Sequence, residues 1–422
     1  MSGDIKKLAI AGEDFSVRRQ CRICGSKRLK MFFSLGNSPL ANNLYDNSEL
    51  AKTQKYYPLE VCLCQDCYLV QLIHIVDPKT LFSRYAYSTG RSIPMNDHFS
   101  GLAQTIANNF SLDENSLVVD VGSNDGTLLS HFLKLNLKVL GIDPAENIVE
   151  LAREKGVKTV NALFNIETAK IVVNDFGQAR VILATNVFAH VDNLDEFVGA
   201  IDCLLETKGV FIIEVPYLLN LLEKTEFDTI YHEHLSYFSI HPLVQLFKKF
   251  NMQIVDIKEL SVHGGSVRIF VQREKSKPSG IINDFLLKED KFGINNITTY
   301  TDFSDKVENL KEKLQKILSD LKISNKKIYG YGASAKSTTL LNYCNIDNKI
   351  IDCICDTTPF KQGKFAPGTG IPIVSDSRLL EDMPDYSLIL AWNYKEHILL
   401  KEAEYLKKGG MFIIPIPEPK II

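Results

Sequence analysis

The sequence lacks any uninterrupted apolar run of the roughly 20 residues that a membrane-spanning helix requires. It also lacks a strong charge of either sign, because 48 Lys and Arg against 51 Asp and Glu leave a formal net charge of −3. Such a balance provides no overall basic surface for nucleic acid. The first residues, MSGDIKKLAIAGEDF, contain acids where a signal peptide would be apolar. We expect a cytoplasmic protein that binds neither a membrane nor a nucleic acid.

Three familiar motifs are approached but not completed. His232-Glu233-His234 places its second histidine two residues after the first, whereas a zincin helix needs four to bring both rings to one metal. The glycines after residue 121 do not follow the dinucleotide spacing, and those near residue 330 do not follow the Walker spacing. These departures exclude a metalloprotease and a P-loop nucleotidase. The length of 422 residues suits two or three domains.

The nine cysteines are unevenly distributed, with five in the first 67 residues. Cys21 and Cys24 form one Cys-x-x-Cys pair, and Cys64 and Cys67 form another. Each pair can turn two thiolates toward one ion, and two pairs complete a tetrahedral zinc site. Cys62 is nearby but lacks the spacing. Four thiolates leave no open position on the metal, so the pattern predicts one structural zinc ion rather than a catalytic one.

A strand, a glycine turn and a helix follow one another from residue 116. The apolar run 116–121 leads into Gly-Ser-Asn-Asp-Gly, and a second strand at 138–143 ends on an acid. Gly122 permits close approach of backbone to a ligand, and Asp143 is placed to bind a ribose diol. The loop resembles the S-adenosylmethionine (SAM) loop of class I methyltransferases, which implies an α/β, Rossmann-like core.

Two further strands extend this pattern. Residues 179–185 lead into Asn186 and on to His190, the region where those enzymes cover the adenine and reach the substrate. Residues 209–216 provide the next strand. Together they complete the strand order expected of a methyltransferase core.

The C-terminal part repeats the strand–turn–helix pattern. Apolar residues recur at helical spacing over 304–322, which predicts a core-facing helix that leads into a new domain. Residues 327–338 then read as strand, glycine turn and helix, so we expect a second Rossmann-like α/β domain. The polar loop 361–372 is placed to lie over a bound group. The turn suits either a substrate phosphate at a helix N-terminus or tight packing, and its candidate substrate-binding residues are Gly332, Ser334 and Lys336.

The four-cysteine module, the SAM loop, Tyr-His-Glu-His-Leu-Ser-Tyr-Phe and Gly-Tyr-Gly-Ala-Ser-Ala-Lys follow one another in this order. From Cys21 to about Pro415, the chain therefore resembles the nucleotide-sugar C-methyltransferases that add a branch methyl at C-3′ of deoxysugar nucleotides. The resemblance implies a zinc module, a SAM domain and a C-terminal domain, with the sugar nucleotide between the last two. We expect these parts to cover residues 1–84, 85–258 and 259–422.

The same resemblance implies roles for individual residues. It places SAM at Gly122, Asp143 and Asn186, with Asn124 and Ser88 as further matches, and zinc at the four paired cysteines. The implied catalytic residues are Tyr231, Glu233, His234, His190 and one tyrosine of the pair Tyr85 and Tyr87.

Methylation of carbon fits these residue types. A ketone makes the neighbouring carbon acidic, so one group must remove its proton and others must stabilise the enolate oxygen. We expect His234 to remove the C-3′ proton of a 4-keto sugar nucleotide, oriented by Glu233, while Tyr231 and His190 bind the oxygen. His190 is the alternative base.

Other assignments stay open on the sequence alone. A SAM-dependent O- or N-methyltransferase needs fewer special residues, and a non-catalytic sugar-nucleotide binder needs none. The nucleotide base, the sugar configuration and the choice between a monomer and a small homo-oligomer are not determined by these motifs.

Overall fold

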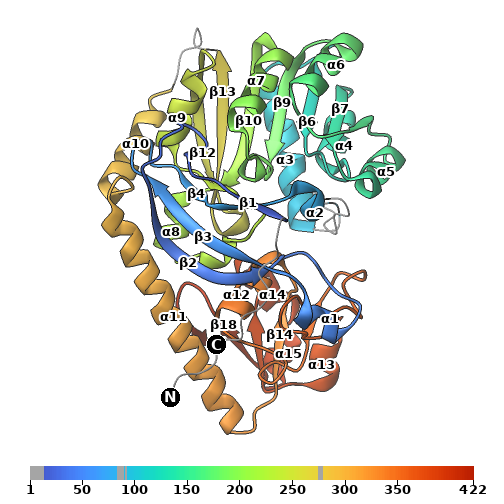
Figure 1. Ribbon diagram of the computed structural model, residues 1–422. Helices are drawn as coiled ribbons and strands as arrows, with labels where there is room; N and C mark the ends of the chain where they lie inside the picture. Colours follow the sequence, from blue (N-terminus) through green and yellow to red (C-terminus); the bar gives the residue numbers. More distant parts are fainter. Residues whose placement is uncertain (1–13, 83–89, 91–92, 274–278) are drawn as a thin grey trace.

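The computed structural model describes residues 14–82, 90, 93–273 and 279–422. In these residues the strands form four sheets, with the largest at one end of the molecule and the C-terminal sheet at the other (Figure 1). Two long, curved N-terminal strands lie between them. In this part of the chain, no helix combines the length and apolarity needed to cross a bilayer.

A seven-stranded mixed sheet forms the part of the chain in which we expect a methyltransferase core, called the methyltransferase part below. Its central strands are apolar on both faces because helices cover both, as is typical of parallel sheets. Helices α3 and α4 pack on one face, and α6 and α7 on the other. In order across the sheet, the strands are β12 (Met252–Leu260), β13 (Ser266–Arg273), β10 (Leu205–Pro216), β9 (Ala179–Thr185), β6 (Leu117–Val121), β7 (Lys138–Asp143) and β8 (Thr159–Asn161). The helices are α3 (Ile93–Asn109), α4 (Thr127–Leu133), α5 (Glu146–Glu154), α6 (Ile166–Phe176), α7 (Leu194–Leu204), α8 (Leu218–Glu223) and α9 (Ile240–Lys248).

The parallel strands β6, β7 and β9 run in one direction, so their carboxyl ends meet at one edge of the sheet. Strand β13 is antiparallel to both β10 and β12. The expected boundary after residue 258 falls within β12, and the sheet continues to Arg273.

The N-terminal part is built on a four-stranded antiparallel sheet. Its last strand, β11, comes from the segment just after His234 and pairs with β4. The stretch that carries the candidate catalytic residues is thereby tied to the cysteine-rich module. The strands are β11 (Ser236–Tyr237), β4 (Val70–Leu72), β3 (Tyr56–Cys64) and β2 (Leu29–Pro39), accompanied by a ribbon of β1 (Phe15–Val17) and β5 (His74–Val76) and by helices α1 (Ser48–Thr53) and α2 (Pro78–Phe82).

The C-terminal part is a second α/β unit, as expected. The predicted helix is α11 (Ile297–Ile323), which buries its apolar stripe and contacts β2 of the zinc module. Helix α10 (Ile281–Phe292) precedes it. The strands, in order, are β16 (Ile373–Ser375), β15 (Ile354–Asp356), β14 (Ile328–Tyr331), β17 (Tyr386–Ile389), β18 (Met411–Ile414) and β19 (Lys420–Ile421). The helices after α11 are α12 (Ala335–Tyr343), α13 (Arg378–Asp382), α14 (Lys395–Lys401) and α15 (Ala403–Lys407).

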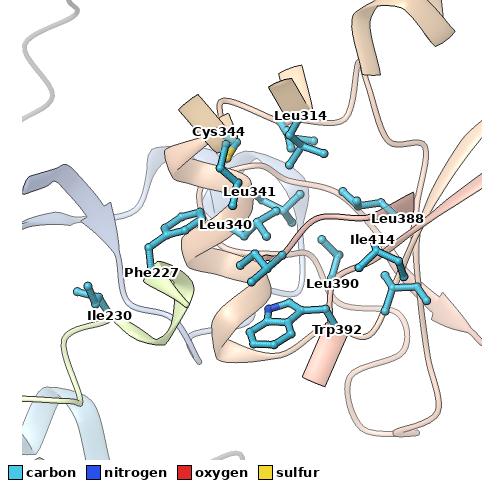
Figure 2. Packing of buried hydrophobic residues seen from close by; sticks show 14 of the residues in the cluster. Phe227, Ile230, Leu314, Leu340, Leu341, Cys344, Leu388, Leu390, Trp392 and Ile414 are labelled. Atoms are coloured by element: carbon cyan, nitrogen blue, oxygen red, sulfur yellow. The ribbon is translucent and has the colours of Figure 1, made fainter. Parts of the chain in front are cut away.

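One hydrophobic core joins the parts of the chain. Phe227 and Ile230 precede the candidate catalytic stretch and belong to the same buried cluster as Leu340, Leu341 and Cys344 of α12 (Figure 2). All five side chains are at most 1% exposed. Burial of a large apolar side chain contributes about 1.5–3 kcal/mol. This packing holds the candidate catalytic stretch against the C-terminal unit.

Candidate active site

The four paired cysteines converge on one point. Their sulfur atoms lie within 4.8 Å of one another, with 3.3 Å between the Sγ atoms of Cys21 and Cys67. Four thiols at this separation fit a tetrahedral zinc site. The Sγ of Cys62 instead faces the carbonyl of Gln71 at 3.5 Å, and burial raises the pKa of its thiol to about 12. Cys62 therefore stands outside the cluster, as its spacing predicts.

A cavity of about 660 Å³ lies where the three parts of the chain meet. Its size is that of a cofactor or small-molecule site. Residues from each part line it. The zinc module contributes Ala41, Asn42 and Leu44, the methyltransferase part contributes Gly122, Asn124, Asp143, Asn186, His190, Tyr231 and His234, and the C-terminal part contributes Ser334, Lys336, Lys361, Asn393 and Tyr394, among others.

Four of the five predicted SAM residues, Gly122, Asn124, Asp143 and Asn186, line the cavity at the carboxyl edge of the parallel strands. Gly122 has φ +68°, and a Cβ there would lie 2.3 Å from a methyl group of Val187. The backbone N–H of Asn124 donates to Asp143 Oδ2 at 3.0 Å, and that of Ala145 donates to Oδ1 at 2.9 Å. Burial raises the pKa of Asp143, while both N–H groups oppose the rise. This close glycine turn beside a held carboxylate fits an adenosine-containing cofactor.

Replacement of Gly122 by alanine is expected to weaken cofactor binding at least tenfold. The added methyl must displace Val187, whose backbone leads toward His190, and an L-residue at positive φ adds about 1–2 kcal/mol of strain. Gly156→Ala is the matched control, since Gly156 also has positive φ (+78°) but nothing within 4 Å of its added Cβ. Calorimetric titration with S-adenosylhomocysteine compares the two. Equal affinities would show that the space at Gly122 does not serve the cofactor.

Two histidines and a tyrosine meet at the cavity wall. His190 lies in the 3₁₀ turn η2 (Phe188–His190), and its ring stacks on that of His234 with 5.2 Å between centroids. The ring centroids of Tyr231 and His234 are 4.1 Å apart. The backbone N–H of Leu235 donates to the carbonyl of Ala189 at 2.8 Å, which holds the two segments side by side. Burial lowers the pKa of His190 to about 4, so this ring is neutral at pH 7.

The hydrogen bonds of His234 define its tautomer. Nδ1 lies 2.8 Å from the carbonyl oxygen of Thr229, which can only accept, so Nδ1 carries the proton. Nε2 is then the acceptor for the Tyr231 hydroxyl, also at 2.8 Å. The carbonyl of Thr229 thus fills the orienting role that we expected of Glu233, because the turn η3 (Phe227–Thr229) brings it under the ring.

Glu233 and His232 lie away from this ring contact. Glu233 is buried, and its Oε1 accepts a hydrogen bond from Nδ2 of Asn42 at 2.6 Å. Nε2 of His232 contacts the carbonyl of Tyr57 at 3.3 Å, and burial lowers the pKa of this histidine to about 4. Neither side chain is among the residues that line the cavity. Asn42 does line it, and no local sequence signal distinguishes it from its neighbours.

The C-terminal glycine turn serves packing as well as the cavity. A Cβ at Gly332 would lie 2.6 Å from that of Ala391, so this glycine is required where β14 meets the neighbouring loop. Ser334 caps α12 through a reciprocal bond pair with Ser337. Lys336 lines the cavity, with its Nζ 4.6 Å from the centroid of the Trp392 ring.

Lys361 also lines the cavity, whereas a buried hydrogen bond between Trp392 and Asp228 lies outside its lining. Lys361, from the loop expected to lie over a bound group, donates to the carbonyl of Ala333 at 2.6 Å. The indole N–H of Trp392 donates to Asp228 at 2.6 Å, and burial raises the pKa of Asp228 to about 6. The composition of the loop 361–372 predicted that Lys361 lies near the cavity, whereas no sequence pattern predicts the contact between Asp228 and Trp392. The expected residues Tyr85, Tyr87 and Ser88 lie outside the described residues.

Comparisons with known proteins cover all three parts of the chain. Residues 21–82 match a zinc binding domain model, residues 96–257 a methyltransferase domain model, and residues 261–417 the C-methyltransferase C-terminal domain model. The chain is 36% identical over 407 residues to the C-methyltransferase NovU of Streptomyces niveus, covering 96% of each protein.

Solved structures resemble part of the chain more distantly. The magnesium protoporphyrin IX methyltransferase ChlM from Synechocystis PCC 6803 is 13% identical, with a TM-score of 0.33 over 42% of this chain and 82% of that one. The plantazolicin methyltransferase BpumL is 14% identical, with a TM-score of 0.34 over 44% of this chain and 86% of that one. The identity along nearly the whole length to NovU, together with the three matched domains, establishes that this chain belongs to the SAM-dependent C-methyltransferases that carry an N-terminal zinc-binding domain.

Proposed function

We propose that the protein transfers the methyl group of SAM to C-3′ of a 4-keto nucleotide-linked deoxysugar. One observation carries this proposal. A single cavity is lined by the glycine loop with Asp143, by the His190, Tyr231 and His234 cluster, and by Lys336. The first set suits a nucleoside cofactor, the second enolate chemistry, and the third an anionic substrate group. The sugar-nucleotide class itself comes from the resemblance of the whole chain to that family.

The histidine–tyrosine pair is suited to proton removal. SAM supplies an electrophilic methyl group when it is bound. The unprotonated Nε2 of His234 accepts a hydrogen bond from the Tyr231 hydroxyl. As the hydroxyl oxygen takes the proton from C-3′, its own proton passes to Nε2, and the hydroxyl is left intact. The C–H bond breaks, its electrons form the enolate, and the imidazolium that results is stabilised by the Thr229 carbonyl on Nδ1. His190, neutral at pH 7, is suited to donate a hydrogen bond to the enolate oxygen.

The test is a panel of 4-keto nucleotide sugars incubated with radiolabelled SAM. A labelled product with the methyl on carbon supports the proposal. Incubation in heavy water without SAM adds a second observation, since exchange at C-3′ reports enolate formation alone. Transfer to oxygen or nitrogen without such exchange would favour the alternative, an O- or N-methyltransferase. Binding of the sugar nucleotide with no transfer at all would indicate a non-catalytic binder.

We also propose that Lys336 binds a phosphate of the substrate, beside the N-terminus of α12, with Ser334 as its neighbour. Lys336→Met is expected to raise KM about 10–100-fold, since a hydrogen bond to a charged group contributes about 1.5–3 kcal/mol. Lys395→Met is the control, because Lys395 faces Glu396 and does not line the cavity. The chain has one tryptophan, Trp392, so its fluorescence reports binding beside Lys336 directly. An unchanged KM would show that Lys336 does not bind the substrate phosphate.

The division of the chain is likewise a proposal. We propose a zinc module over residues 1–84, then a SAM domain, then a C-terminal domain to residue 422 that contributes to sugar-nucleotide binding. The pairing of β13 with β10 and β12 favours a second boundary after Arg273 rather than after residue 258.

A further inference from the structure

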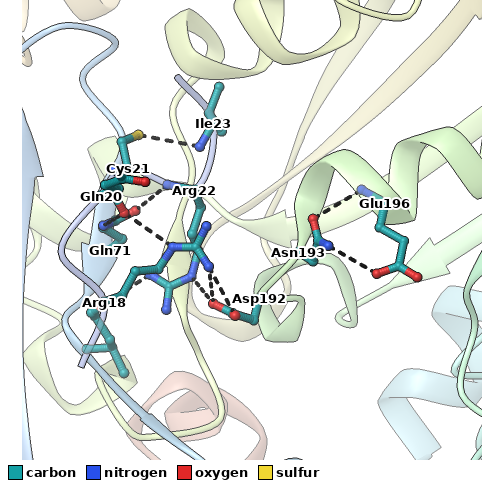
Figure 3. A network of polar contacts seen from close by, with 10 residues as sticks. Arg18, Gln20, Cys21, Arg22, Ile23, Gln71, Asp192, Asn193 and Glu196 are labelled. Carbon is teal, nitrogen blue, oxygen red and sulfur yellow. Dashed lines mark hydrogen bonds and ion pairs between the residues drawn. The ribbon is translucent and has the colours of Figure 1, made fainter. Parts of the chain in front are cut away.

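The side chain of Arg22 extends from the cysteine cluster to Asp192, a residue that lines the cavity. It stands between the first two cysteine ligands, and its side chain is fully buried. Its Nε lies 3.0 Å from Asp192 Oδ1 (Figure 3). Its Nη1 donates to the carbonyl of Leu72 at 2.7 Å. The backbone N–H of Arg22 donates to the side chain of Gln71 at 2.9 Å. The guanidinium therefore bridges the zinc module and the methyltransferase part.

Asp192 connects this arginine to the cavity. It lines the cavity two residues after His190, and both of its carboxylate oxygens lie 3.0 Å from Nη1 of Arg18. The next residue, Asn193, also lines the cavity and caps α7 through the N–H of Glu196. Two arginines of the zinc module thus hold the acid that follows the His190 turn by two residues.

The contact of Arg22 with Leu72 connects it to the segment that carries His234. The N–H of Leu72 donates to the carbonyl of Leu235 at 2.9 Å, and the N–H of Leu235 donates to Ala189 at 2.8 Å. The contacts form a closed ring from Arg22 through Asp192 to the His190 turn, and back through Leu235 and Leu72. The two stacked histidines are next to residues of this chain of contacts: His190 follows Ala189, and His234 precedes Leu235.

We propose that Arg22 is a positioning residue that makes the spacing of His190 and His234 depend on the zinc cluster. A buried guanidinium is stable only with its acceptors in place, and its backbone is fixed by Cys21 and Cys24 on either side. The zinc ion then supports catalysis as well as the fold of its own module. This inference rests on the proposed function of the two histidines.

The test measures hydrogen–deuterium exchange in peptides that cover residues 187–193, together with zinc content, for Arg22→Met. We expect exchange there to quicken at least tenfold while one zinc per chain is retained, and Arg22→Lys to recover part of the protection. Arg28→Met is the matched control, because Arg28 belongs to the same module but pairs with Asp66 at the surface. Unchanged exchange in Arg22→Met with zinc bound would overturn the proposal.

If Arg22→Met loses its zinc, Asp192→Asn provides the test instead. This variant leaves the cysteine turn intact, so quickened exchange at 187–193 with full zinc supports the proposal, and unchanged exchange overturns it. Kinetics are measured with the sugar nucleotide that proves to be a substrate in the panel of 4-keto nucleotide sugars. Both Arg22→Met and Asp192→Asn are expected to lower kcat tenfold or more while KM changes less than threefold. The double variant is expected to be no slower than the slower single variant. If His190→Asn retains full kcat while exchange still responds to Arg22→Met, the role proposed for His190 fails and the structural coupling stands.

Discussion

His234→Gln is expected to lower kcat by about 10²–10⁴-fold, the range that a general base contributes. Glutamine occupies similar space and can keep a contact to Thr229, but its amide is not basic enough to accept the proton that we propose Nε2 of His234 takes from Tyr231. Cofactor affinity is expected to stay within about threefold, because Gly122 and Asp143 are unchanged. Initial rates with labelled SAM and calorimetry with S-adenosylhomocysteine measure the two quantities separately.

His232→Gln is the control for this experiment. His232 belongs to the same short stretch and is buried, but its ring contacts the Tyr57 carbonyl and lies outside the cavity wall. Its replacement should lower the melting temperature and leave kcat within about threefold. Near-normal turnover of His234→Gln with intact cofactor binding would contradict the mechanism.

The pH dependence of kcat separates the two candidate bases. A base must be unprotonated to act, so activity is lost as the pH falls through its pKa. Burial lowers the pKa of His190 to about 4, which would put the acidic limb of a His190-dependent reaction near pH 4. An acidic limb that stays in place in His190→Asn and disappears in His234→Gln assigns the base to His234. The reverse pattern assigns it to His190.

Loss of one zinc ligand is expected to have the largest effect on stability. Cys67→Ser removes a thiolate from a cluster whose metal supplies folding energy, and structural zinc contributes about 10–16 kcal/mol in small zinc-binding peptides. We expect zinc content to fall well below one per chain and the N-terminal module to unfold. Metal analysis and tryptic digestion followed by mass spectrometry would show both, with early cleavage at the arginines around Cys21.

Cys62→Ser is the matched control for the zinc prediction. Cys62 is buried two residues before Cys64 in the same strand, yet its sulfur faces the Gln71 carbonyl and not the cluster. This variant should keep one zinc per chain and lose only the small packing contribution of a buried thiol. Full zinc content in Cys67→Ser would contradict the four-cysteine assignment.

Features that depend on local sequence were predicted well. The Cys-x-x-Cys pairs are short turns whose spacing alone aims two sulfur atoms at one point. The apolar strand, glycine turn and helix at residues 116–133 follow from side-chain period and from the positive φ of Gly122. Parallel strands place their carboxyl ends together, so Asp143 and Asn186 were expected at one edge, and both line the cavity. Their roles in binding SAM stay predictions.

Contacts between distant segments were not predictable in the same way. Asn42 and Glu233 are 191 residues apart, Arg22 and Asp192 are 170 apart, and Asp228 and Trp392 are 164 apart. No periodicity or spacing relates such pairs, because their approach depends on how the three parts of the chain pack against one another. Even within the stretch 229–234, the choice of Thr229 over Glu233 as the partner of Nδ1 depended on the η3 turn.

The sequence by itself predicted the four clustered cysteines, the α/β class of both larger units and the residue types that we propose for enolate chemistry, because each is encoded within a few tens of residues. The tertiary structure alone decided which ring nitrogen of His234 carries the proton and which carboxylates pair with which cations. It also decided that the zinc module borders the cavity. These outcomes depend on the direction of side chains across domain contacts, where a hydrogen bond forms only within about 3 Å.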